Sequence, residues 1–389
     1  MRELSHTAEP SGQPSAASPG HRFVIQPHAA RRMHYDFRLE SAATPVGRAS
    51  RAAANHNRPL SLVEQLPLGF KLTNLDKMLY PDAGITKGDL LAYLAVVSDW
   101  ALPHLANRPL TIVRCPDGLR PRSGTRACFY QKHALAGSPP AIDVVPIVET
   151  DGEAVRSMKV DDMAGMVALG QLGTLEIHTW GCHADKLEHP DLLVFDLDPD
   201  VGLAWNTIAL GALELRRRLR AAGLESFVKT TGGKGLHVVA PVARGIGWDD
   251  FKAFGKAAVE AMERDEPGLY TTNMAKAQRK GKIFLDYLRN GRGATFIAPY
   301  SPRARPGAPV AVPVTWDELA DGVDPAGFTT ATVPRRLATL RADPWHAIAG
   351  IKQAITASAW RAVGGKPRGP SPATHARSPR SRRSRRSTT

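Results

Sequence analysis

An apolar run that ends in two closely spaced acids constrains this chain more than any other feature. Residues 192–195 are Leu-Leu-Val-Phe, and they lead directly into Asp196-Leu197-Asp198-Pro199. Residues i and i+2 of a β-strand face the same side, so Asp196 and Asp198 are expected to project together while Leu197 packs on the opposite side. Pro199 favours the end of the strand. The sequence therefore predicts a buried strand that carries a carboxylate pair to its end.

Two carboxylates this close repel each other unless a cation neutralises them. Hard divalent ions with oxygen ligands, Mg²⁺ or Mn²⁺, suit such a pair. A second strand-like run, residues 282–285, ends in Asp286. If Asp286 reached the pair, the three acids would complete a two-metal site of the kind that serves phosphoryl or nucleotidyl transfer. The alternative is a surface turn, because Asp-x-Asp followed by Pro is a short motif with many chance matches.

A glycine-rich loop follows a strand-like run at residues 226–230. Glycines let the backbone approach an anion closely, and successive N–H groups can hold phosphate. The loop lacks the Walker A pattern and leads into another strand, residues 236–240, so it is neither a P-loop nor a dinucleotide fingerprint. A plain hairpin turn is the alternative interpretation. The candidate phosphate-binding residues are Thr231, Gly232, Gly233, Lys234, Gly235 and His237.

Basic residues gather in the second half of the chain. Four arginines could neutralise a triphosphate or a template strand. The loop 276–282 could follow a nucleic-acid backbone, with a solvated basic loop as the alternative. These residues are Arg289, Arg292, Arg303 and Arg305, with Arg279 and Lys280 in the loop.

His178 lies in the alternating run 175–180, where a lone histidine is more often structural than functional. Cys182 and His183 follow it. Their spacing fits no common zinc framework, so zinc is disfavoured.

Composition bounds the class of protein. The chain has 389 residues, 43% of them hydrophobic, which allows two or three structural units with a sizeable core. No apolar run approaches the roughly 18 residues of a membrane-spanning helix, and residues 1–20 lack the apolar core of a signal peptide. Cys115, Cys128 and Cys182 form no Cys-x-x-Cys pair. We therefore expect no disulfide framework and a soluble, reducing, cytosolic setting.

The net charge of +14 is concentrated at the two ends of the chain. Residues 366–389 carry eight basic residues and no acid, and residues 1–60 carry eight basic and four acidic residues. The body is nearly neutral, so it needs local basic patches to hold a polyanion. The tail is expected to be disordered, and it either adds non-specific affinity for a polyanion such as DNA or is a solvated, inert extension.

Helices and strands are expected to alternate without a regular βαβ period, which favours an α+β architecture. A capping box at Thr86 and Asp89 predicts a helix that runs towards Pro103. Two further helices are expected over residues 205–222 and 249–264, and strands over 110–113, 192–195, 226–230, 236–240 and 282–285. The expected divisions are a disordered leader (1–20), a small segment (21–40), a linker (41–67), the main domain (68–345) and a C-terminal extension (346–389) that becomes a Ser/Pro/Arg tail past Ala357.

The order of the motifs resembles the polymerase domain of bacterial DNA ligase D, a member of the archaeo-eukaryotic primase superfamily. The acid pair, the Gly loop and the run Asp286-Tyr-Leu-Arg-Asn-Gly-Arg occur in that family's order, and the resemblance covers about residues 68–345. It implies a primase-like catalytic core with mixed sheets flanked by helices. Further matching stretches are Leu72–Pro81, Thr86–Lys87, Asn107–Gly118, Phe129–His133 and Ile297–Ser301.

The resemblance implies a template-dependent nucleotidyl transferase that fills gaps and extends ends during bacterial non-homologous end joining. It implies two Mn²⁺ or Mg²⁺ ions and NTP or dNTP substrates, with ribonucleotides preferred. The implied partners are DNA with gaps or double-strand breaks bearing a 5′-phosphate, Ku and a separate ATP-dependent DNA ligase, in the bacterial cytoplasm at the nucleoid and away from membranes.

Site residues are carried over by position. The implied metal-binding acids are Asp196, Asp198 and Asp286. The implied nucleotide-binding residues are His178, Thr231, Gly232, Gly233, Lys234, Gly235, His237 and Arg289. The implied DNA-binding residues are Lys77, Lys87, Arg114, Lys132, Arg279, Lys280 and Arg303.

Two positions depart from the family's pattern. Thr231 stands where Ser is usual, so the hydroxyl is kept. Pro302 stands where Leu is usual, and because Pro fixes φ and removes an N–H, the loop that carries Arg303 is expected to be displaced.

The segment from Gln26 to Glu40 resembles the start of the 3′-phosphoesterase domain of the same multidomain enzyme. His28, His34 and Asp36 would match metal ligands there, and Arg38 a phosphate contact. About 20 residues cannot bury a core of their own, so the segment is interpreted as a remnant. Residual phosphoesterase activity is one alternative function, and a non-catalytic module that binds or bridges DNA ends is another.

Overall fold

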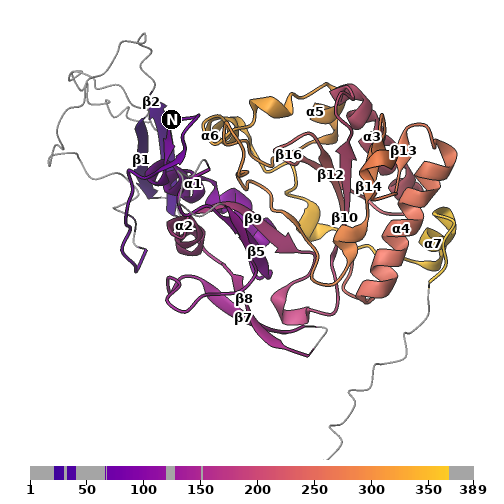
Figure 1. Cartoon of the computed structure of the whole chain (residues 1–389), viewed down its shortest axis with the longest axis horizontal. Coiled ribbons are helices and arrows are strands. Elements are labelled where there is room, and N and C mark those ends of the chain that lie inside the picture. The colour runs from indigo at the N-terminus through magenta and orange to yellow at the C-terminus, as the bar shows by residue number, and fades with distance from the viewer. Residues whose placement is uncertain are drawn as a thin grey trace, which may run out of the picture.

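Two largely antiparallel sheets form the body of the molecule. The computed structural model describes residues 22–29, 33–40, 66, 68–119, 128–149 and 152–367. Sheet I has the strand order β13-β14-β10-β12-β11-β16, and sheet II has the order β15-β9-β5-β8-β7 with β6 added beside β5. Figure 1 shows sheet II with α1 and α2 in the indigo and magenta half, and sheet I with α3 and α4 in the orange half.

Sheet I contains the acid pair and the glycine-rich loop identified in the sequence. Its central strand, β10, begins at Leu192 and ends at Pro199, so both acids of the pair lie within the strand. The strands of sheet I are β10 (Leu192–Pro199), β11 (Phe227–Thr230), β12 (Leu236–Pro241), β13 (Tyr270–Thr271), β14 (Ile283–Asp286) and β16 (Pro313–Val314).

Sheet II is built around β9, all seven residues of which are buried. Its strands are β5 (Leu110–Arg114), β6 (Phe129–Gln131), β7 (Asp143–Val148), β8 (Ala154–Lys159), β9 (Thr174–Trp180) and β15 (Thr295–Ile297). Phe296 of β15 packs with Leu192, Val194 and Val239 of sheet I, so the two sheets share one apolar seam.

Helices cover the outer faces of both sheets. The capping box that predicts α1 is present, with Asp89 N–H donating to the Thr86 hydroxyl, and α1 extends to Leu105 with Pro103 inside its last turn. The helices are α1 (Lys87–Leu105), α2 (Met163–Gln171), α3 (Trp205–Ala221), α4 (Trp248–Asp265), α5 (Trp316–Ala320), α6 (Val333–Thr339) and α7 (Ala357–Ala362). Short 3₁₀ turns lie at Ala184–Lys186, Lys276–Arg279, Leu288–Asn290, Pro325–Gly327 and Ile348–Gly350. Among the described residues, no helix is long and apolar enough to span a membrane.

Two small strand pairs lie outside the main sheets. Strands β3 (Met78–Tyr80) and β4 (Ile85–Thr86) pair just before α1. Strands β1 (Arg22–Ala29) and β2 (Met33–Glu40) form an antiparallel pair. The side chains of β1 and β2 lie outside the described part of the structure, so the predicted ligands His28, His34 and Asp36 are not placed.

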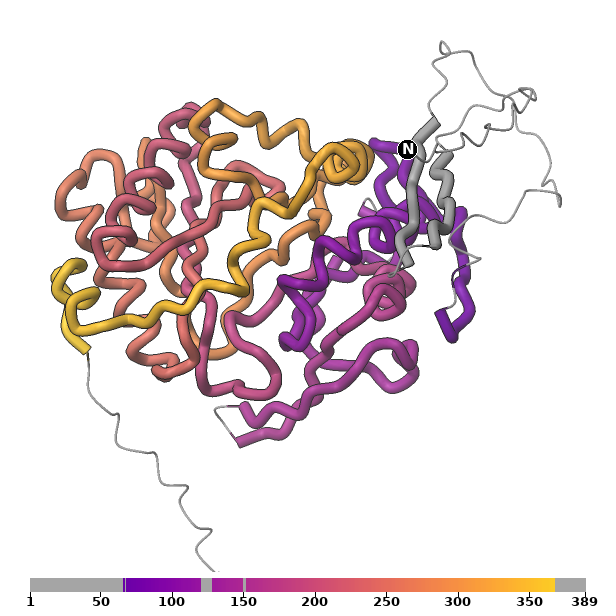
Figure 2. Tube along the Cα trace, turned by 180° about the vertical axis from the view of Figure 1, so that it is seen from behind, coloured from indigo at the N-terminus to yellow at the C-terminus, as the bar shows by residue number. Residues whose placement is uncertain are grey.

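The prediction of a tail past Ala357 is wrong for its first residues. Figure 2 shows the yellow C-terminal segment crossing the back of the molecule and ending in a helix. That helix, α7, buries Trp360 against Phe254 of α4, with ring centroids 5.3 Å apart. The amide of Gln353 also donates to the carbonyls of Glu225 and Pro241. The folded part therefore includes residues 357–367: Trp360 anchors α7 to α4, and the bonds of Gln353 anchor the segment that leads into it.

The expectation of no disulfide is also wrong. Cys115 and Cys128 are joined by a disulfide, while Cys182 is free and buried. Arg114 pairs with Phe129 across β5 and β6, so Cys115 and Cys128 are the next opposed pair, at the end of the hairpin where the chain leaves β5 and enters β6. A search for Cys-x-x-Cys pairs misses cysteines that only strand pairing brings together.

Candidate active site

The three acids singled out from the sequence lie on one face of sheet I. Asp196 of β10 pairs directly with Asp286 of β14, and Asp198 follows two residues later on β10. On the other side of β10, Asp196 pairs with His237 of β12. The sheet therefore sets an imidazole and two carboxylates in one row across three strands, with the third carboxylate on the next row of the same face.

Arginines partly neutralise the negative charge of these carboxylates. Arg289 spans two of them, with Nη2 3.3 Å from Asp196 Oδ2 and Nε 3.3 Å from Asp286 Oδ2. Arg279 Nη1 lies 3.6 Å from Asp198 Oδ2. The loop 287–292 positions Arg289 because Leu288 N–H donates to Asp286 Oδ1 at the end of β14.

The three carboxyl groups differ in how easily they ionise. Burial raises the pKa of Asp196, but His237 and Arg289 bring it down to about 2. Burial and the charge of Asp196 raise the pKa of Asp198, and burial together with Asp196 raises that of Asp286 against the effect of Arg289. The repulsion between neighbouring carboxylates is therefore only partly relieved by arginine.

These acids have the donor type that a hard divalent cation prefers, and their mutual repulsion is what such a cation would relieve. Among the described residues, however, no three Asp, Glu, His or Cys side chains converge into a metal-binding group. An ion would have to compete with Arg289 and Arg279 for the carboxylate oxygens. In the chemistry of their oxygen donors the residues fit Mg²⁺ or Mn²⁺.

The glycine loop is a tight hairpin between β11 and β12 that ends at the carboxylates. The Thr231 hydroxyl donates to Gly235 O at 3.1 Å and closes the hairpin. A Cβ on Gly235 would lie 2.5 Å from Leu197 O, and a Cβ on Gly232, whose φ is +64°, would lie 2.7 Å from Arg303 Cγ. Glycine is therefore needed at both positions so that the hairpin can press against β10 and the Arg303 loop.

His237 begins the return strand of this hairpin and faces Asp196. Its Nε2 lies 3.5 Å from Asp196 Oδ2. Burial and the nearby Lys229 lower the pKa of His237 to about 4. The imidazole is consequently neutral at physiological pH and can donate one N–H.

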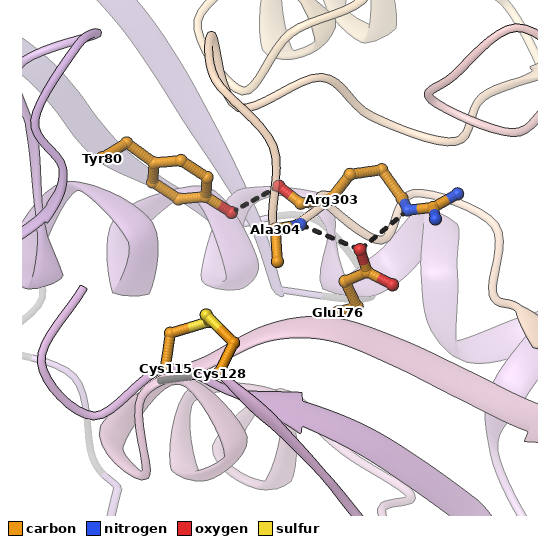
Figure 3. Close-up of a disulfide and its surroundings, with 6 residues drawn as sticks. All are labelled: Tyr80, Cys115, Cys128, Glu176, Arg303 and Ala304. Carbon is orange, nitrogen blue, oxygen red and sulfur yellow. Dashed lines mark hydrogen bonds and ion pairs between the residues drawn. A yellow bond between two sulfur atoms is a disulfide. The ribbon is translucent and has the colours of Figure 1, made fainter. Parts of the chain in front are cut away.

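A buried carboxylate of sheet II holds the opposite wall of the site. Glu176 Oε2 lies 2.8 Å from His178 Nε2, and Glu176 Oε1 accepts from both Arg303 Nε and the Ala304 N–H at 3.0 Å. Figure 3 shows Glu176 below the Arg303 loop, with the Tyr80 hydroxyl donating to the Arg303 carbonyl from the other side. These bonds fix His178 and Arg303 in place.

The structure places Arg303, which follows Pro302, at the site. Arg303 N–H donates to Pro309 O at 2.8 Å, and its Nη1 donates to Thr231 O at 2.6 Å. The loop therefore places Arg303 against the glycine hairpin.

These elements enclose an open pocket of about 710 Å³ between the two sheets. Of the residues predicted for the site, the pocket is lined by Asp196, Asp198, His178, Thr231, Gly233, Lys234, Gly235, His237, Arg279, Arg289 and Arg303. Asp286 and Gly232 do not themselves line the pocket, but Asp286 contacts Arg289 and Gly232 lies against Arg303, and both of these arginines do. Arg305 also lines the pocket, whereas Arg292 is directed to Glu188.

Three other predicted basic residues gather away from this pocket. Lys77 Nζ bonds Asp117 at 2.8 Å, and Arg114 donates to Gln131 and to Leu172 O. Lys87 is buried, and burial together with the charges of Lys77 and Arg114 lowers its pKa to about 8. The three cations form a separate basic cluster near the start of α1.

The remaining two predicted DNA-binding residues lie elsewhere. Lys132 lines a smaller pocket of about 150 Å³ that also includes Trp180 and Arg292. Lys280 is exposed beyond the end of its 3₁₀ turn.

Sequence reasoning missed two groups of the pocket. Glu176 precedes His178 by two residues on β9, so alternation along that strand could have suggested that both face the site. Tyr130, 67% exposed, lies with its ring 5.9 Å from that of His178, and nothing in the sequence indicated this long-range contact.

The zinc interpretation of Cys182 finds no support in this arrangement. Cys182 is buried, which raises its thiol pKa to about 12, and His183 instead lies 3.2 Å from Asp191.

Comparison with known proteins agrees with this geometry. A family profile described as "LigD, primase-polymerase domain" matches residues 86–345. This chain belongs to that family. A structure of the polymerase domain of Mycobacterium tuberculosis ligase D in complex with DNA matches with a TM-score of 0.66 and 31% identity, over 72% of this chain and 98% of that one. The primase-like α+β fold expected from the sequence is confirmed.

The curated relatives in the LigD family are longer proteins. A multifunctional non-homologous end joining protein LigD from Pseudomonas aeruginosa is 34% identical over 82% of this chain and 37% of its own length. A bifunctional non-homologous end joining protein LigD from Bacillus subtilis is 31% identical over 69% of this chain and 42% of its own length. The chain thus spans less than half of these relatives.

Proposed function

We propose that this chain is a template-dependent nucleotidyl transferase that fills gaps and extends ends in the repair of DNA double-strand breaks by non-homologous end joining. The observation that carries the proposal is the row of Asp286, Asp196 and His237 beside Asp198, facing a pocket closed by the glycine hairpin. Relatives named for non-homologous end joining, and a structural neighbour solved with DNA, support this choice of substrate.

In the proposed reaction a primer 3′-oxygen attacks the α-phosphorus of a nucleoside triphosphate, and pyrophosphate leaves. Asp196, Asp198 and Asp286 would hold two Mn²⁺ or Mg²⁺ ions, which lower the pKa of the 3′-hydroxyl and stabilise the leaving group. Residues of the chain itself would bind and orient the triphosphate and the DNA.

The hairpin and its neighbours bind the triphosphate. The N–H groups around Gly232 and Gly233 approach phosphate oxygens closely, and Lys234 adds a positive charge at the exposed tip. His237 would donate its Nε2–H, and Arg289, which lies 3.3 Å from Asp196 and Asp286, would supply positive charge to the phosphates. On the opposite wall His178, held by Glu176, lies beside Tyr130 at the sugar or base.

The basic cluster of Lys77, Lys87 and Arg114 would hold the downstream 5′-phosphate of a gap. Arg279, Lys280 and Lys132 would follow the template backbone, with Arg303 at the junction of the two sheets. Ku and a separate ATP-dependent ligase would supply end binding and sealing in the bacterial nucleoid.

Primer extension on a gapped duplex with a downstream 5′-phosphate, Mn²⁺ and either NTPs or dNTPs tests the proposal. Addition should occur with the natural chain and fall by at least a thousandfold with Asp196→Ala/Asp198→Ala, while DNA binding persists. DNA binding without addition by either protein would instead indicate a non-catalytic module that bridges DNA ends.

A further inference from the structure

A lysine that no sequence motif explains lies beneath the proposed nucleotide site. Lys229 of β11 is 0% exposed, and among the described residues its Nζ has no hydrogen-bond partner. Burying an amine without a hydrogen-bond partner costs free energy of folding, so the presence of Lys229 at this position needs an explanation. His237 Nδ1 is likewise buried without a partner.

The strand register places these two groups together. Lys229 pairs directly with His237 across β11 and β12, and His237 pairs with Asp196 across β12 and β10. Side chains directly opposed on antiparallel strands have Cβ atoms about 4.5–5.5 Å apart and share a face. The row therefore runs Lys229, His237, Asp196 and Asp286 across four strands.

The contacts of the imidazole leave one nitrogen for Lys229. His237 Nε2 lies 3.5 Å from Asp196 Oδ2, and Phe296 meets the ring edge-on at a centroid distance of 6.1 Å. Nδ1 remains as an acceptor.

We propose that Lys229 is a positioning residue for nucleotide binding. Its Nζ donates to His237 Nδ1, directly after a side-chain rotation or through one bound water. This bond keeps the proton of the ring on Nε2 and holds Nε2–H towards the pocket. The inference rests on the proposed function only in assigning the triphosphate as the group that Nε2–H meets.

The first test is independent of polymerase activity. In ¹⁵N-histidine NMR spectra of the full chain at neutral pH, His237, assigned by its loss in His237→Ala, should show a protonated Nε2 and a hydrogen-bonded, unprotonated Nδ1. Lys229→Met should shift Nδ1 to the value of a free acceptor. A natural chain with a protonated Nδ1, or no change in Lys229→Met, would overturn the proposal even if the chain is an active polymerase.

The second test separates positioning from mere stability. Lys229→Met should raise KM for the nucleotide about tenfold with kcat within threefold, and Lys229→Gln, which keeps an N–H donor, should restore most of the KM. In a His237→Ala background, Lys229→Met should add less than twofold. Equal effects in both backgrounds would show that Lys229 acts through the packing of the sheet and not through His237.

Discussion

At the scale of the residue, the site contains like charges that lie close together and whose repulsion is only partly neutralised. Arg289 lies between Asp196 and Asp286, where it relieves a repulsion that a divalent cation would relieve more fully. Lys87 is buried among like charges that weaken its hold on a proton. Each arrangement therefore predicts the effect of replacing one side chain, Arg289 or Lys87.

Replacing Arg289 with Gln should separate metal binding from nucleotide binding. Without the competing guanidinium, Mn²⁺ should bind the free protein several-fold more tightly, whereas KM for the nucleotide should rise at least tenfold because a charge-assisted contact to phosphate is lost. Electron paramagnetic resonance of unbound Mn²⁺ and single-nucleotide kinetics would measure the two effects.

Arg292→Gln is the matched control, because Arg292 bonds Glu188 and Val148 O away from the carboxylates. This substitution should change the affinity for Mn²⁺ and the KM for the nucleotide by less than twofold. If Arg289→Gln weakened Mn²⁺ binding, the idea of competition would be wrong.

Recognition of the 5′-phosphate should depend on pH through Lys87. Its pKa of about 8 in the free protein is lowered, so the charged form prevails below pH 8 and is lost as pH rises through that value. The preference for a gap with a 5′-phosphate over one with a 5′-hydroxyl should therefore be full at pH 7 and decline roughly tenfold by pH 9, since a charge-assisted bond contributes about 1.5–3 kcal/mol.

Binding measured by fluorescence anisotropy at several pH values would check this. Lys87→Met should have a small preference that does not vary with pH, whereas Lys256→Met, which alters an exposed ion pair on α4, should behave like the natural chain. An unchanged pH dependence in Lys87→Met would contradict the assignment.

At the scale of the element, two hairpins place the functional groups. The glycine hairpin between β11 and β12 presses on β10, and the hairpin of β5 and β6 carries Tyr130 to His178. The first depends on missing Cβ atoms, and the second on a disulfide at the end where the chain leaves β5 and enters β6.

Gly235→Ala should push the glycine hairpin away from the carboxylates. The new Cβ would lie 2.5 Å from Leu197 O, a backbone atom that cannot yield cheaply. We expect a loss of about 1–3 kcal/mol in stability and a rise of tenfold or more in KM for the nucleotide. Gly268→Ala, where nothing lies within 4 Å of the added Cβ, should change neither in thermal melts and kinetics.

Breaking the disulfide should loosen β6 more than the rest of sheet II. The bond closes a loop with a sequence separation of 13 residues, for which the chain-entropy treatment gives roughly 3 kcal/mol. Cys128→Ser should lower Tm and speed hydrogen exchange at Phe129–Gln131. Reductant should do the same to the natural chain and nothing more to the variant; equal exchange in both proteins would contradict a role in fixing β6.

At the scale of the whole molecule, local patterns predicted four of the strands of sheet I and its acids, but not its edge strands β13 and β16 or the seam between the sheets. The run into Asp196, the loop at Thr231 and the helices after Thr86 and Trp205 are short-range signals, and each element forms where its pattern lies. Glu176, Lys229 and the Cys115–Cys128 bond depend on which strands become neighbours. Periodicity within a segment can suggest that Glu176 shares a face with His178, but it carries no information on strand pairing, so the contacts of these residues emerge only from the assembled fold.

If the carboxylate row and the glycine hairpin perform templated nucleotidyl transfer, the choice of nucleotide must follow the template base. This can be measured as single-nucleotide addition to a gapped duplex in Mn²⁺, with each of the four template bases offered each of the four nucleotides. We predict that the complementary nucleotide is added at least tenfold faster in every case, and that Asp286→Asn abolishes all addition. Addition that ignores the template base, or that survives in Asp286→Asn, would contradict it.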